Sequence, residues 1–305
     1  MFVMNRIINL VNRCANKVVM HTDWYNNKMW GGASKFWHQN VFGLDVVNLG
    51  SGAGVHAFNY ESVDIKGANW ALGPQSLVHD FNILKNYFSF IREGGCVIIT
   101  VCPFSGLFSQ YGRDHNFKYY SFLHPATILN FEESERQKAF RYKLNPFKEI
   151  PMICIKETIK EQIRKLRKRP EVSMESSAKA IMNGWMKQFC IEDLSSSLSM
   201  QHQQEIEIRK KTLLEMSEFC KERSLNPIIV LPVMNYSLLR LFPKEFKYNY
   251  IDRLTRDVGI PVLDYMKDEM SDNDMYFANA LMLNEIGAKY FTQKVIKDMA
   301  DREQL

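Results

Sequence analysis

The sequence lacks the cysteine spacings that mark a metal site or a disulfide framework. Its six cysteines, at positions 14, 96, 102, 154, 190 and 220, are far apart, with no CxxC pair and no histidine at a zinc-binding spacing. Two of them, Cys96 and Cys102, lie in an apolar, strand-like run. We therefore expect reduced thiols, in or near the core of a cytoplasmic protein, and no metal site.

Long apolar runs are also missing. The N-terminal MFVMNRIINLVNRCANKVVM is interrupted by Arg6, Arg13 and Lys17, so it provides neither the hydrophobic region of a signal peptide nor a span of roughly 20 apolar residues. We expect an amphipathic helix there and no transmembrane segment. The net charge of +5 is small for 305 residues and its basic residues are spread along the chain. This excludes a whole-protein nucleic-acid footprint, but it leaves a surface patch open.

The chain does contain enough apolar sequence for a large core, with 46% hydrophobic and 24% charged residues. Buried strands are predicted at 46–49, 96–102, 228–233 and 260–265. Helices are predicted between and after them, at 77–95 with Glu93-Gly94-Gly95 as the stop, and at 203–223, 245–257 and 284–300. Alternating strands and helices indicate an α/β fold: a three-layer, doubly wound parallel sheet of the flavodoxin-like type.

The expected organisation is one α/β domain with additions. Residues 1–43 are predicted to form a helix and an aromatic flap, 44–299 the domain, with a helical and loop insertion at about 105–200, and 300–305 a tail. The tryptophans of the flap indicate a lid or packing segment over the domain, or else a partner surface. In the insertion, KETIKEQIRKLRKRP reads as a helix that either has a solvated basic face or meets phosphate or an acidic membrane surface, through Arg164, Lys165, Arg167, Lys168 and Arg169.

The stretch LDVVNLGSGAG (44–54) is the first candidate site, because ligands of open α/β sheets bind at the carboxyl ends of strands. NLGSGAG resembles the first motif of S-adenosylmethionine-dependent methyltransferases, in which Asp64 of VDIK would hold the ribose. That fold needs a helix and a strand, roughly 20 residues, between the glycines and the acid. Only ten positions separate Gly54 from Asp64, so the spacing argues against this interpretation.

Several blocks, taken in order, resemble the SGNH/GDSL hydrolase superfamily. They are NLGSG (48–52), GANWALGPQSL (67–77), GGCVIITVCPFS (94–105) and DMYFANALMLNEIGAKYFT (274–292). The nearest branch is that of SGNH-like proteins from bacterial surface-polysaccharide gene clusters, including relatives of the D-alanyl transfer protein of teichoic acids. The resemblance implies an SGNH-hydrolase-like fold over about 44–299, with no cofactor.

The resemblance also implies where a catalytic site would lie. The nucleophilic serine of the family falls on Gly52, with Ser51 one place earlier, and the oxyanion glycine falls on Gly73, with Asn69 as its candidate partner. The family's third-block asparagine has no match, and Ser105 is the nearest polar residue. Its aspartate falls on Asn279 and its histidine on Met282.

A site with these residues has no obvious base. Methionine cannot accept a proton, and a serine hydroxyl is a weak nucleophile without a base. His56 and His79 are the candidate substitute bases for Ser51, although each also fits an ordinary polar residue.

Two function classes therefore stay open besides the methyltransferase. One is an O-acyl esterase or acyltransferase of surface-polysaccharide biosynthesis, acting on a glycan or an acylated small molecule. The other is a catalytically inactive scaffold that binds a glycan or a protein partner. Aromatic residues at 24, 30, 37, 104, 108, 111, 119 and 120 suit either sugar stacking or core packing.

Overall fold

The computed structural model describes residues 2–108, 117–166 and 173–302. Tyr111, Arg167, Lys168 and Arg169 therefore lie outside the described residues. The chain divides into two compact units, of which unit 1 contains residues 1–40 and 111–171, and unit 2 contains residues 41–110 and 172–305. The N-terminal segment and much of the insertion, expected as separate additions, thus belong to one unit.

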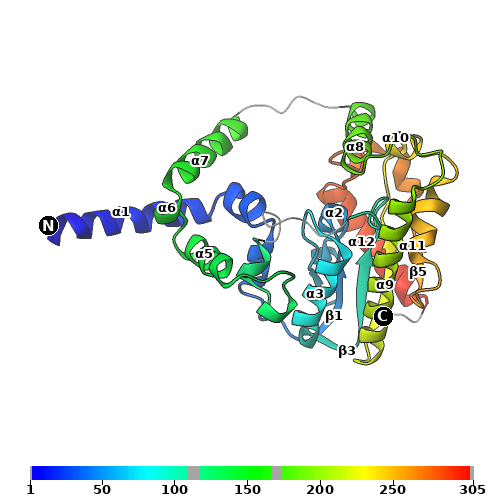
Figure 1. Ribbon diagram of the computed structural model, residues 1–305, viewed down its shortest axis with the longest axis horizontal. Helices are drawn as coiled ribbons and strands as arrows, with labels where there is room; N and C mark the ends of the chain where they lie inside the picture. Colours follow the sequence, from blue (N-terminus) through cyan, green and yellow to red (C-terminus); the bar gives the residue numbers. More distant parts are fainter. Residues whose placement is uncertain (1, 109–116, 167–172, 303–305) are drawn as a thin grey trace. The chain divides into compact units, whose positions relative to one another are not determined.

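Unit 2 is an α/β unit built on a five-stranded parallel sheet (Figure 1). Its strands are β1 (Leu44–Leu49), β2 (Gly67–Asn69), β3 (Ile91–Thr100), β4 (Asn226–Leu231) and β5 (Val262–Asp264). They lie in the order β2-β1-β3-β4-β5, which is the order of flavodoxin-like sheets. The predicted α/β class with a parallel sheet is confirmed.

The helices of unit 2 connect these strands. They are α2 (Gly52–Ala57), α3 (Leu77–Tyr87), α8 (Met174–Gln188), α9 (Met200–Lys221), α10 (Tyr236–Leu239), α11 (Arg253–Thr255) and α12 (Glu285–Ala300). Short helical turns are η3 (Tyr60–Ser62), η4 (Phe88–Phe90), η7 (Lys247–Asp252), η8 (Glu269–Asp272) and η9 (Asp274–Tyr276).

The two faces of the sheet are covered by different helices because strand side chains alternate in direction. Val46, Ile98 and Val230 belong to a core cluster with Phe291 and Val295 of α12. The opposite face carries α9, which contacts β4 and also packs against α3. Apolar side chains on both faces explain why the central strands read as continuous hydrophobic runs.

Three sequence predictions differ from the structure. The strand β2 was not predicted, because it has only three half-buried residues at the sheet edge. The helix predicted to end at Gly94-Gly95 ends at Tyr87, and both glycines lie within β3. They form an irregularity where Gly94 has φ +73° and a Cβ on Gly95 would come within 2.5 Å of Ile91. The helix predicted at 245–257 is the π-turn η7 followed by α11.

Unit 1 is helical. It contains α1 (Phe2–Met20), η1 (Trp24–Met29), η2 (Ala33–Phe36), η5 (Tyr119–Ser121), η6 (Pro125–Thr127), α5 (Glu133–Leu144), α6 (Pro146–Glu149) and α7 (Pro151–Leu166). Its aromatic rings pack on one another: Trp30 stacks on Phe117, and Phe36 stacks on Phe122. The flap rings therefore form the core of unit 1 together with the insertion.

Burial also corrects two expectations about individual residues. The rings at 24, 30, 104, 119 and 120 are buried, so core packing, the second of the two interpretations, describes them, and their faces are not open to a sugar. Among the cysteines, Cys14 and Cys190 are exposed rather than in the core, whereas the other four are buried. Within the described part of the chain, no helix is both long and apolar enough to cross a membrane.

Candidate functional site

The loop after β1 lies where the sheet itself favours a ligand. β1 is flanked by β2 on one side and by β3 on the other, so the chain leaves the carboxyl ends of β1 and β3 at a topological switch point. Gly50 follows β1 with φ +132°, and a Cβ there would lie 2.8 Å from the Thr100 Cβ at the end of β3. Only glycine fits this backbone position, which fixes where Ser51 and Gly52 emerge.

Three residues that the resemblance placed in the site converge in the structure. A Cβ on Gly52 would lie 3.2 Å from the Met282 Cε, and a Cβ on Gly73 would lie 3.5 Å from the Gly52 Cα. These residues come from the start of α2, from the segment after β2 and from the segment between β5 and α12. Two glycines and a thioether offer no group that could act as an acid or a base.

Ser51 is beside this cluster but has no catalytic partner. It occupies the N-cap position of α2, and its hydroxyl accepts a hydrogen bond of 3.4 Å from the Gln75 backbone N–H. The hydroxyl therefore faces the Gly73–Gln75 segment. Among the described residues, no histidine or carboxylate is hydrogen-bonded to it.

The two candidate bases are placed elsewhere. His79 of α3 is buried and shares a 2.9 Å hydrogen bond with the Ser76 hydroxyl through its Nδ1. His56 is the fifth residue of α2, and burial lowers its pKa, so its imidazole is neutral at pH 7. Both histidines are consistent with structural or ligand-binding roles.

Asn279 holds Met282 in place. Its Oδ1 accepts hydrogen bonds from the backbone N–H groups of Leu281 and Met282, at 3.0 and 2.9 Å. The side chain therefore closes its own turn instead of orienting a base. A carboxylate at this position could accept the same two hydrogen bonds.

Asn69 fastens β2 to α2. Its amide donates to the carbonyl groups of Gly54, Val55 and Phe58, and its Oδ1 accepts from the Ala71 N–H. Both amide hydrogens are used within the protein, so none is left for an oxyanion. Ser105 is similarly occupied: its hydroxyl is buried and accepts the Cys102 N–H at 2.8 Å.

Sequence reasoning missed a buried polar pair below the loop. The Asp80 carboxylate accepts the Gly50 N–H at 2.8 Å, and the same carboxylate oxygen accepts a hydrogen bond from the Gln75 side chain. Asp80 is three residues after Leu77 and four before Leu84, on the buried face of α3. A carboxylate on the apolar face of the predicted helix was the feature of the sequence that could have indicated this buried polar pair.

Cys102 lies against this pair without being reactive. Burial, with the Asp80 charge, raises the pKa of the Cys102 thiol to about 12. The thiol is therefore protonated at neutral pH and is a poor nucleophile. No cluster of three or more histidine, cysteine, aspartate or glutamate side chains that could hold a metal ion is found in residues 2–108, 117–166 and 173–302.

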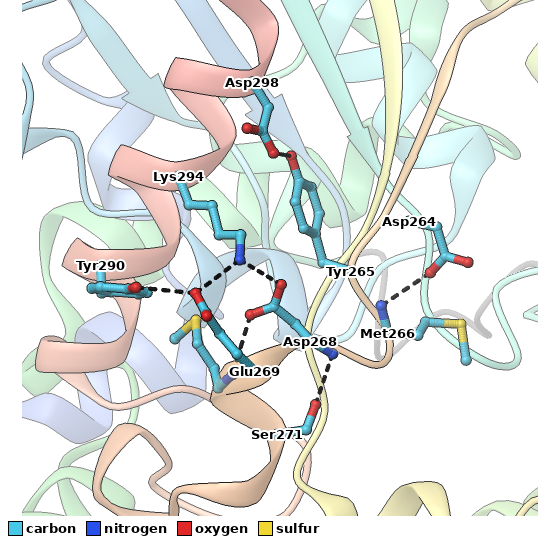
Figure 2. A network of polar contacts seen from close by, with 10 residues as sticks. Asp264, Tyr265, Met266, Asp268, Glu269, Ser271, Tyr290, Lys294 and Asp298 are labelled. Carbon is cyan, nitrogen blue, oxygen red and sulfur yellow. Dashed lines mark hydrogen bonds and ion pairs between the residues drawn. The ribbon is translucent and has the colours of Figure 1, made fainter.

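The segment that carries Asn279 and Met282 is fixed at both ends. At its start, the Lys294 ammonium bridges Asp268 at 2.7 Å and Glu269 at 3.2 Å, as Figure 2 shows. At its end, the Asn284 side chain caps α12 by accepting the Gly287 N–H. The placement of Met282 over Gly52 is thus built into the fold.

A cavity of about 820 Å³ lies beside β2 at the edge of the sheet and reaches Leu44 and Gly67 at the amino ends of β1 and β2; Gly52, Gly73 and Met282 are not among the residues that line it. Both α2, which begins at Gly52, and the segment that carries Met282 contribute to its wall, through His56 and Leu283. Other lining side chains include Val41, Val55, Tyr60, Glu61, Ile65, Lys66 and Glu285. Its volume is in the range of cavities that bind small molecules.

The methyltransferase arrangement is not formed by the predicted residues. Asp64 precedes β2. Two residues later, the Lys66 backbone N–H donates to the Asp45 side chain and the Lys66 carbonyl accepts the Asp45 N–H, at the beginning of β1. In a parallel sheet these amino ends lie at the edge opposite to the carboxyl ends. Asp64 is therefore at the wrong edge to act with Gly50 and Gly52 on a ribose.

The chain matches no family model, and no match is found among curated proteins.

Proposed function

We propose that the chain is a non-catalytic protein of the SGNH/GDSL type, which binds a glycan or a similar neutral polar ligand in surface-polysaccharide biosynthesis or modification. The observation that carries this proposal is the Met282 methyl group beside Gly52, with Gly73 also in contact distance of that glycine. The flavodoxin-like strand order supports the same relationship.

Ester hydrolysis or acyl transfer requires more than this site offers. A serine nucleophile needs a base within hydrogen-bond reach and donors for the oxyanion. At the position that corresponds to the nucleophile there is no hydroxyl, and at the position of the base there is a thioether. An enzyme would have to use Ser51, whose hydroxyl has the Gln75 N–H as its only hydrogen-bond partner among residues 2–108, 117–166 and 173–302.

The cavity beside β2 supports binding. A neutral imidazole on His56 can both donate and accept a hydrogen bond, and Glu61, Lys66 and Glu285 add charged groups to a wall that also holds asparagine and apolar side chains. Hydroxyl groups of a sugar pair with these polar side chains, and its C–H faces suit Val55 and Ile65. The resemblance to polysaccharide-cluster proteins leads to the same class of ligand.

One experiment separates the scaffold from the enzyme. Purified wild type and Ser51→Ala are assayed with a small activated acetyl ester over a range of pH, with mass spectrometry for an acyl-enzyme. We expect equal rates and no acyl group. Turnover that depends on Ser51 would contradict the proposal and favour the O-acyl esterase or acyltransferase.

A second experiment tests the geometry directly. The double variant Gly52→Ser/Met282→His places a hydroxyl and an imidazole where the Cβ and the Cε are 3.2 Å apart. We expect this variant to be labelled by a fluorophosphonate, whereas each single variant is not, because neither has both groups. Absence of labelling in a folded double variant would count against the SGNH-like arrangement.

Ligand binding is tested by calorimetry with a panel of neutral oligosaccharides. His56→Ala is expected to weaken binding about tenfold through the loss of one or two hydrogen bonds. The matched control is His38→Ala, because His38 is exposed in unit 1 and contributes nothing to the cavity. Equal effects of the two variants would place the ligand elsewhere.

A further inference from the structure

Helix α7 in unit 1 has its apolar side turned outward. Five side chains, three and four residues apart, are between 43% and 86% exposed: Met152, Ile155, Ile159, Ile163 and Leu166. At 3.6 residues per turn they occupy an arc of about 80°. A helix normally buries such a stripe, so this orientation requires an explanation.

The side of α7 that packs against unit 1 carries two buried residues, Cys154 and Glu161. Glu161 lies opposite the stripe and is only 3% exposed. Its carboxylate accepts the Trp24 backbone N–H at 3.0 Å and pairs with Lys165 at 2.8 Å. Lys165 is on the same helix, so it is the Trp24 contact that fixes the rotation of α7, and the apolar stripe cannot turn inward without breaking that hydrogen bond.

Helix α1 repeats the arrangement independently. Asn16 is buried, and its Oδ1 accepts the Phe147 N–H at 2.8 Å. Leu10, Val11 and Val18, on the other side of the helix, are 54–63% exposed. Two helices of the same unit thus present unpartnered apolar faces to the outside.

Both stripes have basic neighbours. Lys156, Lys160 and Arg164 follow one flank of the α7 stripe at four-residue spacing, and Arg13 and Lys17 lie beside Leu10 on α1. Unit 1 holds 19 lysine and arginine residues against nine aspartate and glutamate residues, a formal charge of +10, although the whole chain carries only +5. Unit 2 holds the other 20 basic residues and 25 acidic ones, a formal charge of −5, so the net positive charge of the chain lies in unit 1.

We propose that unit 1 binds the surface of an anionic lipid bilayer through the outward apolar faces of α1 and α7. The apolar side chains enter the boundary between headgroups and acyl chains, while the basic flanks contact the lipid phosphates. A bilayer accepts exposed stripes on two helices without a matching groove. A second copy of the chain is disfavoured as the occupant, because two units of +10 repel each other. This binding is independent of the ligand proposed for unit 2.

The primary test is flotation of the full chain with vesicles. One preparation contains phosphatidylcholine alone, and the other contains equal parts of phosphatidylcholine and phosphatidylglycerol. We expect binding to the anionic vesicles that exceeds binding to the neutral ones, and that falls as salt is raised to about 0.5 M, where charges are screened within a few ångström. Absence of binding to the anionic vesicles would overturn the proposal.

Variants separate the two contributions. Ile159→Gln/Ile163→Gln is expected to lower partitioning at least tenfold on anionic vesicles, through lost apolar burial. Lys156→Gln/Arg164→Gln is expected to lower it about 25-fold, from about fivefold for each charge. The matched control is Ile286→Gln, since Ile286 lies on α12 in unit 2 and is 58% exposed. An equal loss in the control would overturn the assignment to α7.

The exposed cysteines provide a second readout. Cys14 lies on α1 and Cys190 lies in unit 2, and both are exposed. The emission of an environment-sensitive fluorophore on Cys14, in a Cys190→Ser background, should shift to shorter wavelength on anionic vesicles. The emission of the same fluorophore on Cys190, in a Cys14→Ser background, should not shift. Two results would overturn the proposal. One is a concentration-dependent dimer that the isoleucine variants abolish. The other is that the isoleucine variants lose thermal stability while the wild type does not bind vesicles. They would assign the face to a second copy or to another part of the same chain.

Discussion

Two glycines of the candidate site, only two positions apart, should differ in how strongly alanine destabilises the protein. Gly50 has φ +132°, and its new Cβ would lie 2.8 Å from the Thr100 Cβ and 3.1 Å from the Thr100 carbonyl oxygen. Gly52 is the first residue of α2, and its new Cβ would meet only the Met282 Cε, at 3.2 Å, which is the end of a flexible side chain. The two substitutions therefore compare a new Cβ against the rigid backbone and Cβ of Thr100 with a new Cβ against the flexible side chain of Met282.

The magnitudes follow from the two environments. For Gly50→Ala, backbone strain costs about 1–3 kcal/mol and the steric overlap about 1–3 kcal/mol, against a gain of about 0.4–1 kcal/mol from the stiffer unfolded chain. The expected loss in the free energy of unfolding is about 2–4 kcal/mol. Gly52→Ala is expected to stay within about 1 kcal/mol of the wild type, because the same gain offsets a small movement of Met282.

Hydrogen exchange in urea is the suitable assay, because peptides from β1 and β3 report on unit 2 alone. The free energy of opening is compared for the wild type and both variants. Equal destabilisation by the two substitutions, or a Gly50→Ala protein as stable as the wild type, would refute the described path of the loop from β1 to α2.

Three further predictions concern ionisable groups. At pH 8, iodoacetamide should modify the two exposed cysteines well before the four buried ones, because burial raises the pKa values of the buried thiols to about 11 or 12. Mass spectrometry of peptides shows which cysteines are modified. Early labelling of Cys102 would contradict its burial. Lys294→Met should lower the free energy of unfolding by about 1–2 kcal/mol at pH 7. Burial acts to lower the pKa of Lys294, but Asp268 and Glu269 outweigh burial and raise that pKa. The difference in stability between the wild type and Lys294→Met should therefore disappear only as pH rises above 10.5. A stability difference that is unchanged at that pH would exclude the ion pair as its cause. For Glu161, burial acts to raise the pKa, but hydrogen bonds from Lys165 and the Trp24 backbone outweigh burial and hold the pKa below 4.5. The difference in stability between the wild type and Glu161→Gln, measured by thermal melts, should therefore narrow as pH falls below 4.5. A difference that stays constant would contradict this.

Local sequence predicted the elements whose apolar pattern is strong. The runs at 46–49 and 96–102 correspond to β1 and β3, and the helix after Asn284 is present as α12 with that residue as its cap. The period of hydrophobic residues is a local property, so it survives in any tertiary context. For β2, with only three residues, no such period exists, and pairing with β1 alone makes it a strand.

The end of the predicted helix at 77–95 was decided by pairing as well. A Gly-Gly pair stops a helix and also allows a bulge in a strand. Pairing of Ile91 with Leu44 and of Cys96 with Val46 places both glycines within β3. Pairing with the neighbouring strands, which the local sequence does not reveal, therefore determines that this segment is a strand and not the end of a helix.

The site divides in the same way. The resemblance pointed to Gly52, Gly73 and Met282 one at a time, but the fold brings them together, because their segments are far apart in the chain. The roles of Asn69, Asn279 and Asp80 depend on backbone groups that the fold carries to them.

The orientation of α7 is the clearest case of a tertiary decision. Its sequence determines that one side is apolar and another basic, but an amphipathic helix in isolation has no inside. The contacts of Glu161 with Trp24, 137 residues away, turn the apolar side outward. Sequence thus set the chemistry of each segment, and long-range hydrogen bonds and packing set which chemistry faces the core, the site or the surroundings.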